Sequence, residues 1–277
     1  MESRRISDEE RQFFDENGYL IVRGALQGEK LRRVVEAADG LVSARYRETG
    51  SRRASLSNVV ALEESFIPLL TLETTVPLVV QLLSFNIRLT KSHLIYKYPD
   101  PEDVEEPTFW HRDIRNSAED LGPAANTRMQ IKVAYHLSDA MAPGCGNTWL
   151  VPGSNKYTQP LEIPEGAGDP ANALEPQLRA GDAFLFENRT YHRQGLNRTQ
   201  MTRKVLMFGY SYAWLSPNDF EVQAEEVLDR IHDPIARQLM GAARSPNSQI
   251  DYRPLREWAE QHGVRRASEI GCEQLTG

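Results

Sequence analysis

The sequence contains little cysteine and no long apolar run. Its 277 residues include two cysteines, Cys145 and Cys272, which are too few for a disulfide framework and suit a reducing compartment. No stretch approaches the ~18 consecutive apolar residues of a membrane helix. The charged start Met1–Arg5 also lacks the apolar segment of a signal peptide. We therefore expect a cytoplasmic protein without a membrane partner.

Basic residues are fewer than acidic residues. The 32 Lys and Arg residues face 39 Asp and Glu residues, and the resulting net charge of −7 argues against broad nucleic-acid binding. Hydrophobic residues make up 40% of the chain and charged residues 26%, as in globular proteins, which excludes a disordered or collagen-like chain. A chain of this length forms one or two domains, and β-barrels reach it as one.

Three stretches differ in their residue pattern. Residues 1–85 show helical periodicity, with a capping box at Ser7 and Glu10, a short strand at 19–23 and a helix over 28–39. Residues 86–214 contain short strands separated by turns, which predicts a sandwich or barrel. Residues 215–277 are helical and polar. Because neither a repeat nor a linker interrupts the chain, we expect a single domain with helices around a β core.

A metal-binding pattern lies in the β region, at Trp110-His111-Arg112-Asp113. On a strand, residues i and i+2 point to one face, so His111 and Asp113 can offer a nitrogen and an oxygen to one ion. His192, at the end of a later strand, is the best third ligand. Two histidines and one carboxylate that leave other positions open form the facial triad of non-haem Fe(II) oxygenases. Arg112 points the other way, which favours a structural role.

Arg203 follows His192 by 11 residues, with a turn at Gly195–Asn197 between them. The turn would return the chain, so a strand that begins at Arg203 can lie beside His192. Its guanidinium could bind a carboxylate bidentately near the metal, and we expect the C5 carboxylate of 2-oxoglutarate there.

Four segments carry a family resemblance, in the family's order: Phe14–Leu26, Trp110–Asp113, Gly146–Lys156 and His192–Arg203. They resemble segments of the phytanoyl-CoA dioxygenase family of Fe(II)/2-oxoglutarate-dependent oxygenases, and the resemblance covers most of the chain. It implies a mainly β fold with flanking helices and a double-stranded β-helix (jelly-roll, cupin-like) core. It also implies Fe(II) as the metal, 2-oxoglutarate as cosubstrate and O2 as oxidant.

Two positions depart from the family pattern, and a third position, which matches it, favours oxygenation over halogenation. Asn155 stands where the family has His, and Gln194 stands where many members have a Ser that helps hold 2-oxoglutarate. An amide can still donate a hydrogen bond. A halogenating relative would carry Gly or Ala at the position of Asp113, so the carboxylate favours oxygenation.

The strand at residues 128–137 alternates, with apolar side chains at odd positions and Gln130, Lys132, Ala134 and His136 on the other face. If this second face lines the barrel, Lys132 and Gln130 reach the cosubstrate or the substrate. The candidates for cosubstrate binding are Arg203, Lys132, Gln130, Thr148 and Gln194. Those for substrate binding are Arg115 and Arg128, while His93 and His136 are interpreted as packing histidines.

The residues near the distal histidine suggest the charge of the substrate. Between positions 189 and 204 there are five cations and no acid: Arg189, Arg193, Arg198, Arg203 and Lys204. A surplus of cations suits a small anionic substrate, such as a carboxylate, phosphate or phosphonate, with an aminoalkylphosphonate as one candidate. The reaction expected is hydroxylation of a C–H bond.

Two alternatives remain open at this point. The same fold supports desaturation, epimerisation or ring closure in natural-product tailoring, because these outcomes share their iron chemistry. A non-catalytic cupin-like protein that binds a metal or ligand is the other alternative, and the complete triad with Arg203 argues against it. The sequence leaves the oligomeric state undetermined.

Overall fold

The computed structural model describes residues 4–49, 54–105, 109–114, 116–122, 126–242 and 252–264. The elements that precede the long central strands are α1 (Asp8–Asn17), β1 (Tyr19–Val22), α2 (Gly28–Thr49), β2 (Ala54–Ser57), α3 (Val59–Leu62), the 3-10 helix η1 (Glu64–Thr71) and α4 (Val76–Leu82). The β region contains β3 (Ile87–Lys97), α5 (Asn116–Leu121), β4 (Gln130–His136), β5 (Thr148–Leu150), the 3-10 helix η2 (Ser154–Lys156), β6 (Ala183–Glu187), β7 (His192–Gln194) and β8 (Arg203–Tyr212). Three helices follow it: α6 (Glu225–Leu228), α7 (Pro234–Leu239) and α8 (Arg253–Gln261).

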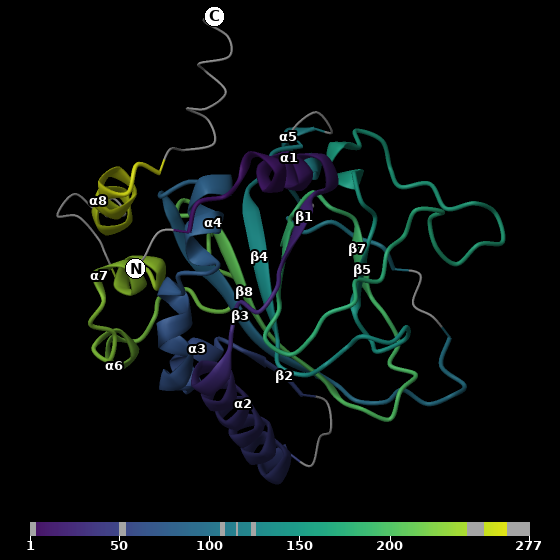
Figure 1. The fold of residues 1–277 in the computed structure, drawn as a ribbon, viewed down its shortest axis with the longest axis horizontal. Helices are drawn as coiled ribbons and strands as arrows, with labels where there is room; N and C mark the ends of the chain where they lie inside the picture. The colour runs from purple at the N-terminus through teal and green to yellow at the C-terminus, as the bar shows by residue number, and fades with distance from the viewer. Residues whose placement is uncertain are drawn as a thin grey trace, which may run out of the picture.

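The strands form two antiparallel sheets. The large sheet has the order β1-β6-β4-β8-β3-β2, and the small sheet pairs β5 with β7. Single bridges from His111 to His192 and from Leu150 to Leu174 extend the small sheet on both sides. In Figure 1, α4, α7 and α8 lie on one side of β4 and β8, and β5 and β7 lie on the other. The predicted β core with flanking helices is confirmed.

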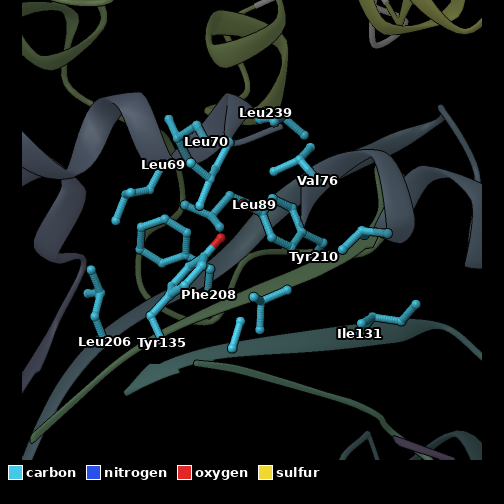
Figure 2. Close-up of a cluster of buried hydrophobic side chains, with 14 of the residues drawn as sticks. Leu69, Leu70, Val76, Leu89, Ile131, Tyr135, Leu206, Phe208, Tyr210 and Leu239 are labelled. Carbon is cyan, nitrogen blue, oxygen red and sulfur yellow. The ribbon is translucent and has the colours of Figure 1, made fainter. Parts of the chain in front are cut away.

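Strand β4 is buried along its whole length because it is covered on both faces. Its odd residues Ile131 and Tyr135 join the larger apolar core, which α4, η1 and α7 cover, with Leu70 and Leu239 from these helices (Figure 2). Its even residue Ala134 packs in a smaller core between the sheets. The predicted alternation is confirmed, and the even face lines the barrel interior.

A capping box and a glycine define the two ends of helix α1, which leads into the large sheet. The Ser7 hydroxyl accepts a hydrogen bond from the Glu10 N–H at 3.1 Å, and the Glu10 carboxylate accepts one from the Ser7 N–H at 3.1 Å. Helix α1 ends at Gly18 with φ 78°, where a side chain is also excluded because its Cβ would lie 2.1 Å from Thr190 Oγ1.

Two predicted helical stretches have different lengths in the structure. Helix α2 runs to Thr49 rather than Asp39, because Val42 continues its buried face and exposed pairs such as Arg45 with Glu48 support the added turns. The described part of the C-terminal stretch holds only short helices of four, six and nine residues. Among the described helices, none alone is long and apolar enough to cross a membrane; the bent pair η1 and α4 passes that test jointly, by length and composition only.

A buried carboxylate ties the start of the chain to the barrel. Glu187, at the end of β6, is fully buried and forms ion pairs with Arg128 Nε at 3.0 Å and with Arg189 Nε at 2.7 Å. Arg128 also contacts Asp15 Oδ1 at 2.5 Å and lies over the Phe14 ring of α1. Burial alone would raise the pKa of Glu187, but the hydrogen bonds and charges of the two arginines outweigh it and lower the pKa.

We predict that Glu187→Gln destabilises the protein by about 2 kcal/mol or more at neutral pH, because Arg189 loses its carboxylate partner and Arg128 keeps only Asp15. The lowered pKa means that the Glu187 contribution is present above the ordinary carboxyl pKa and is lost as the pH falls through the folded-state value. The variant should therefore lose less stability than the wild type between about pH 7 and about pH 4. Urea unfolding at both pH values measures this, with the exposed Glu257→Gln as control, and equal losses in both proteins would contradict it.

Candidate metal centre

Backbone pairing brings the two predicted histidine ligands together. His111 N–H donates to His192 O at 3.0 Å, and His192 N–H donates to His111 O at 2.9 Å. This antiparallel bridge places the two residues directly opposite each other, with ring centroids 4.3 Å apart. His192 starts β7. Its ring also makes an edge-on contact with the Phe186 ring of the large sheet, with the two ring centroids 5.0 Å apart.

Asp113 completes the cluster from a turn rather than from a strand. The chain turns after His111, and Asp113 N–H donates to Asn188 O at 3.0 Å, which fixes the turn. Ligand atoms of His111, Asp113 and His192 all lie within 4.8 Å of one another. His192 Nε2 is 3.5 Å from Asp113 Oδ2. The expectation that an extended strand aligns His111 and Asp113 is therefore wrong in its local geometry.

The charge states of the three side chains suit a divalent cation. His192 Nδ1 lies 2.9 Å from Thr190 O, which assigns the proton to Nδ1 and leaves Nε2 free to bind a metal. Burial lowers the pKa of His192 to about 4 and also lowers the pKa of His111, so both rings are neutral. Burial opposes ionisation of Asp113, but Lys132 and His192 outweigh it and hold its pKa well below the ordinary value. Two imidazoles and a carboxylate fit Fe(II).

Arg112 and the predicted cations of β4 have distinct surroundings. Arg112 donates to Ser154 O at 2.7 Å, and its guanidinium lies 4.3 Å from the centroid of the Tyr191 ring. Lys132 projects from the inner face of β4, and its Nζ lies 2.6 Å from Asp113 Oδ2. Gln130, two residues earlier on this face, donates to Ser211 Oγ at 2.9 Å.

Arg203 lies at the other end of the barrel interior. It begins β8, is 4% exposed and forms no hydrogen bond or ion pair with the described residues; burial lowers its pKa to about 10. His136 is equally buried on the inner face of β4, and its Nδ1 has no partner there. Burial and the charge of Arg203 lower the pKa of His136 to about 3. Thr148 shares a face of β5 with the inner-core residue Leu150. This end could hold a carboxylate.

An arginine sandwiched between two tryptophans braces the ligand segments. Arg193, next to His192, is fully buried, 5.3 Å from the Trp110 ring and 4.6 Å from the Trp149 ring. It binds Asp169 through Nε and Nη2 at 2.8 Å each, and Trp110 Nε1 donates to the same carboxylate at 3.0 Å. We refer to Trp110, Trp149, Asp169 and Arg193 as the arginine clamp. Asp169 was not predicted, because no local pattern connects it with the ligand segments.

A cavity of about 480 Å³ opens beside His111 and Asp113. Its wall includes Phe109, which stacks on His111 at 5.3 Å, and also Lys91, Gln130, Ser211, Leu215 and Asn218. A second hollow of about 610 Å³ adjoins the other side of His111 and is lined in part by Lys97 and the exposed Gln194. Lys91 was also missed by sequence reasoning, although strand alternation places it with His93.

The two predicted substrate arginines lie outside this cluster. Arg128 is held by Glu187 and Asp15, and it is not part of the cavity wall. Arg115 lies outside the described residues. Of the predicted site residues, the structure thus brings His111, Asp113, His192, Lys132 and Gln130 to one end of the barrel interior, with Arg203 and Thr148 farther along it.

Solved structures share this fold. The nickel- and 2-oxoglutarate-bound HygX from Streptomyces hygroscopicus has a TM-score of 0.61 and 19% identity, over 79% of this chain and 90% of HygX. The epimerase SnoN from nogalamycin biosynthesis, a non-haem α-ketoglutarate-dependent enzyme, has a TM-score of 0.55 and 20% identity, over 74% of this chain and 80% of SnoN. These similarities confirm the predicted jelly-roll fold.

Fungal dioxygenases match shorter parts of the sequence. The dioxygenase olcK of Penicillium canescens is 26% identical over 119 residues, which is 43% of this chain and 34% of olcK. The dioxygenase sphC of Aspergillus fumigatus is 30% identical over 97 residues, which is 35% of this chain and 25% of sphC. The matches thus span about a third or less of these two proteins.

The family profile spans the metal ligands and Arg203. The profile of the phytanoyl-CoA dioxygenase (PhyH) family matches residues 14–205, which include the His-Asp-His cluster and Arg203. Fe(II), 2-oxoglutarate and O2 are the cofactor and cosubstrates of that family, as predicted from the sequence. This chain belongs to the phytanoyl-CoA dioxygenase family of Fe(II)/2-oxoglutarate-dependent oxygenases.

Proposed function

We propose that the protein hydroxylates a C–H bond of a small anionic molecule, with Fe(II), 2-oxoglutarate and O2. The observation that carries this proposal is the convergence of two neutral histidines and one carboxylate within 4.8 Å of one another, beside a cavity that Lys91 lines. Neutral imidazoles and a carboxylate leave other positions of a bound iron free for cosubstrate and oxidant.

The bound iron would supply activation of O2, coupled to oxidative decarboxylation of 2-oxoglutarate. His111, Asp113 and His192 hold the metal in this proposal. Arg203 binds the C5 carboxylate of 2-oxoglutarate, because it is a buried cation that has no partner among the described residues. Thr148 and Gln194 are further candidates for cosubstrate binding, from positions paired across β5 and β7.

The cavity beside the metal ligands supports a small anionic substrate. Lys91 lines it, and Lys132 lies beside it on the inner face of β4. Asp113, a metal ligand in this proposal, is the one acid among its described lining residues. Phe109 and Leu215 provide an apolar part of the cavity wall. A carboxylate or a phosphonate fits this charge pattern, and an aminoalkylphosphonate remains one candidate.

A second candidate is a tailoring oxygenase of the same fold. SnoN, which shares the fold, is named an epimerase, and desaturation or ring closure needs the same metal centre. These outcomes differ only in how the substrate lies over the metal. A cupin-like protein that binds a ligand without turnover is the third possibility, and iron-dependent succinate formation would exclude it.

We predict that the anaerobic protein with Fe(II) and 2-oxoglutarate develops a visible metal-to-ligand charge-transfer band. His192→Ala should abolish it, because only two ligands then remain. Absorption spectroscopy with and without 2-oxoglutarate measures the band. A wild-type protein that folds, binds Fe(II) and shows no band would favour the binding-protein alternative.

We predict that Asp169→Asn lowers the Fe(II) affinity about tenfold. The substitution keeps the side-chain shape but removes the carboxylate charge that binds Arg193 through two nitrogens, so the brace between the segments of His111 and His192 is weakened. Competition with a fluorescent chelator measures the affinity, and Glu165→Gln, at an exposed position of the same loop, is the control. Wild-type affinity in a folded Asp169→Asn protein would show that the clamp does not position the ligands.

We predict that anionic compounds stimulate succinate release and yield a product one oxygen atom heavier. The test panel comprises aminoalkylphosphonates, small carboxylates and neutral lipophilic compounds, assayed for succinate and by mass spectrometry. Turnover of neutral lipophilic compounds alone would refute an anionic substrate. A product lacking two hydrogens, or a stereoisomer of the substrate, would favour the tailoring alternative.

A further inference from the structure

A β-bulge shapes the cavity floor. Strand β3 pairs with β8 in register except between Leu89 and Lys91, where Thr90 is the extra residue. A bulge of this kind turns successive side chains toward one face of a sheet. Thr90 Oγ1 lies 2.8 Å from Ser211 Oγ inside the barrel, and Lys91 lines the same cavity. The irregularity therefore directs a lysine into the interior beside the metal ligands.

A glycine keeps the space in front of this lysine open. Gly209 of β8 is in register with Lys91 on one side and with Lys132 on the other. A Cβ atom at Gly209 would lie 3.2 Å from Lys91 Cβ and 3.4 Å from Gln130 Nε2. A side chain there would press on Lys91 and Gln130, which both line the cavity, so the glycine leaves room for these two side chains.

Lys91 and the neighbouring Lys132 differ in their partners. Lys132 Nζ is 2.6 Å from Asp113 Oδ2. Lys91 forms no hydrogen bond or ion pair with the part of the chain that the structure describes, although it is half-buried. The nearby Asp219 is engaged by His93 Nε2 at 2.8 Å and by backbone N–H groups. A half-buried ammonium without an ion-pair partner is costly unless a ligand supplies one.

The orientation of the Gln130 amide is set by its neighbours. The Thr90 hydroxyl donates to Gly209 O at 3.1 Å, so it can only accept from Gln130, and Gln130 Nε2 donates to it at 3.2 Å. Gln130 is 4% exposed, and its Oε1 accepts no hydrogen bond from the described residues. The cavity therefore presents an ammonium donor and an amide acceptor side by side.

We propose that Lys91, above the gap left by Gly209, binds the anionic group of the substrate, while Gln130 Oε1 accepts a hydrogen bond from the same molecule. This inference rests on the proposed function and names the residue that decides the substrate class. The neighbouring Lys132 is already paired with Asp113, and Arg203 lies at the far end of the barrel interior. The anion of the substrate and the carboxylate of 2-oxoglutarate are thereby bound by different cations.

The test is calorimetric titration of the full chain, loaded anaerobically with Fe(II) and 2-oxoglutarate, with methylphosphonate and separately with acetate. Lys91→Gln should weaken binding of the preferred anion about tenfold or more, because a charge-assisted hydrogen bond is lost. Lys91→Arg should keep most of the affinity. Gly209→Ala should weaken binding without any change of charge. The matched control is Lys30→Gln, an exposed lysine paired with Glu73 on the helical side.

The affinity for 2-oxoglutarate, measured in the same proteins, separates this role from cosubstrate binding. It should be unchanged in Lys91→Gln. If Lys91→Gln binds the anion as tightly as the wild type does, the proposal is overturned. A parallel loss of 2-oxoglutarate affinity in this variant would also overturn it, as would a wild-type protein that binds neither probe. Iron-dependent succinate formation by the wild type without any anion tests the proposed function separately, so either can fail alone.

Discussion

The site depends on one pair of backbone hydrogen bonds, between His111 and His192. These residues lie 81 positions apart in the sequence, and only antiparallel pairing makes them neighbours. A shift of one residue in this register would turn one ring to the opposite face of the sheet. The arginine clamp holds the register from outside the barrel, because Trp110 precedes one histidine and Arg193 follows the other. The contact of Asp113 N–H with Asn188 O then adds the carboxylate.

Buried charges inside this protein fall into two classes. Glu187 is compensated by Arg128 and Arg189, which makes it a structural element of the barrel end. Arg203 and Lys91 are buried or half-buried and have no compensating partner among the described residues. Since an uncompensated buried charge costs stability, its presence in a cavity indicates a ligand of opposite charge. The distinction separates Arg128, predicted as a substrate ligand, from Lys91, which was not predicted.

Periodic patterns predicted the parts of the structure that local sequence determines. The alternation over residues 128–137 gave both faces of β4, and Ser7 with Glu10 gave the start of α1. The spacing of His111, Asp113 and His192 was sufficient to predict a metal site. The turn at Asp113, the bulge at Thr90 and the contribution of Asp169 depend on pairing with distant strands and loops. No local pattern contains that information, so sequence reasoning missed them.

The net charge of −7 does not describe the barrel interior. Acids outnumber cations over the whole chain, whereas the described barrel interior holds the cations Lys91, Lys132 and Arg203 beside Asp113. Asp113 offsets Lys132, and the C5 carboxylate of 2-oxoglutarate would offset Arg203. Lys91 then remains the cation of the cavity wall that has no ion-pair partner among the described residues. One such cation matches a negative charge placed beside it, and this electrostatic argument favours an anionic over a neutral substrate group in the cavity.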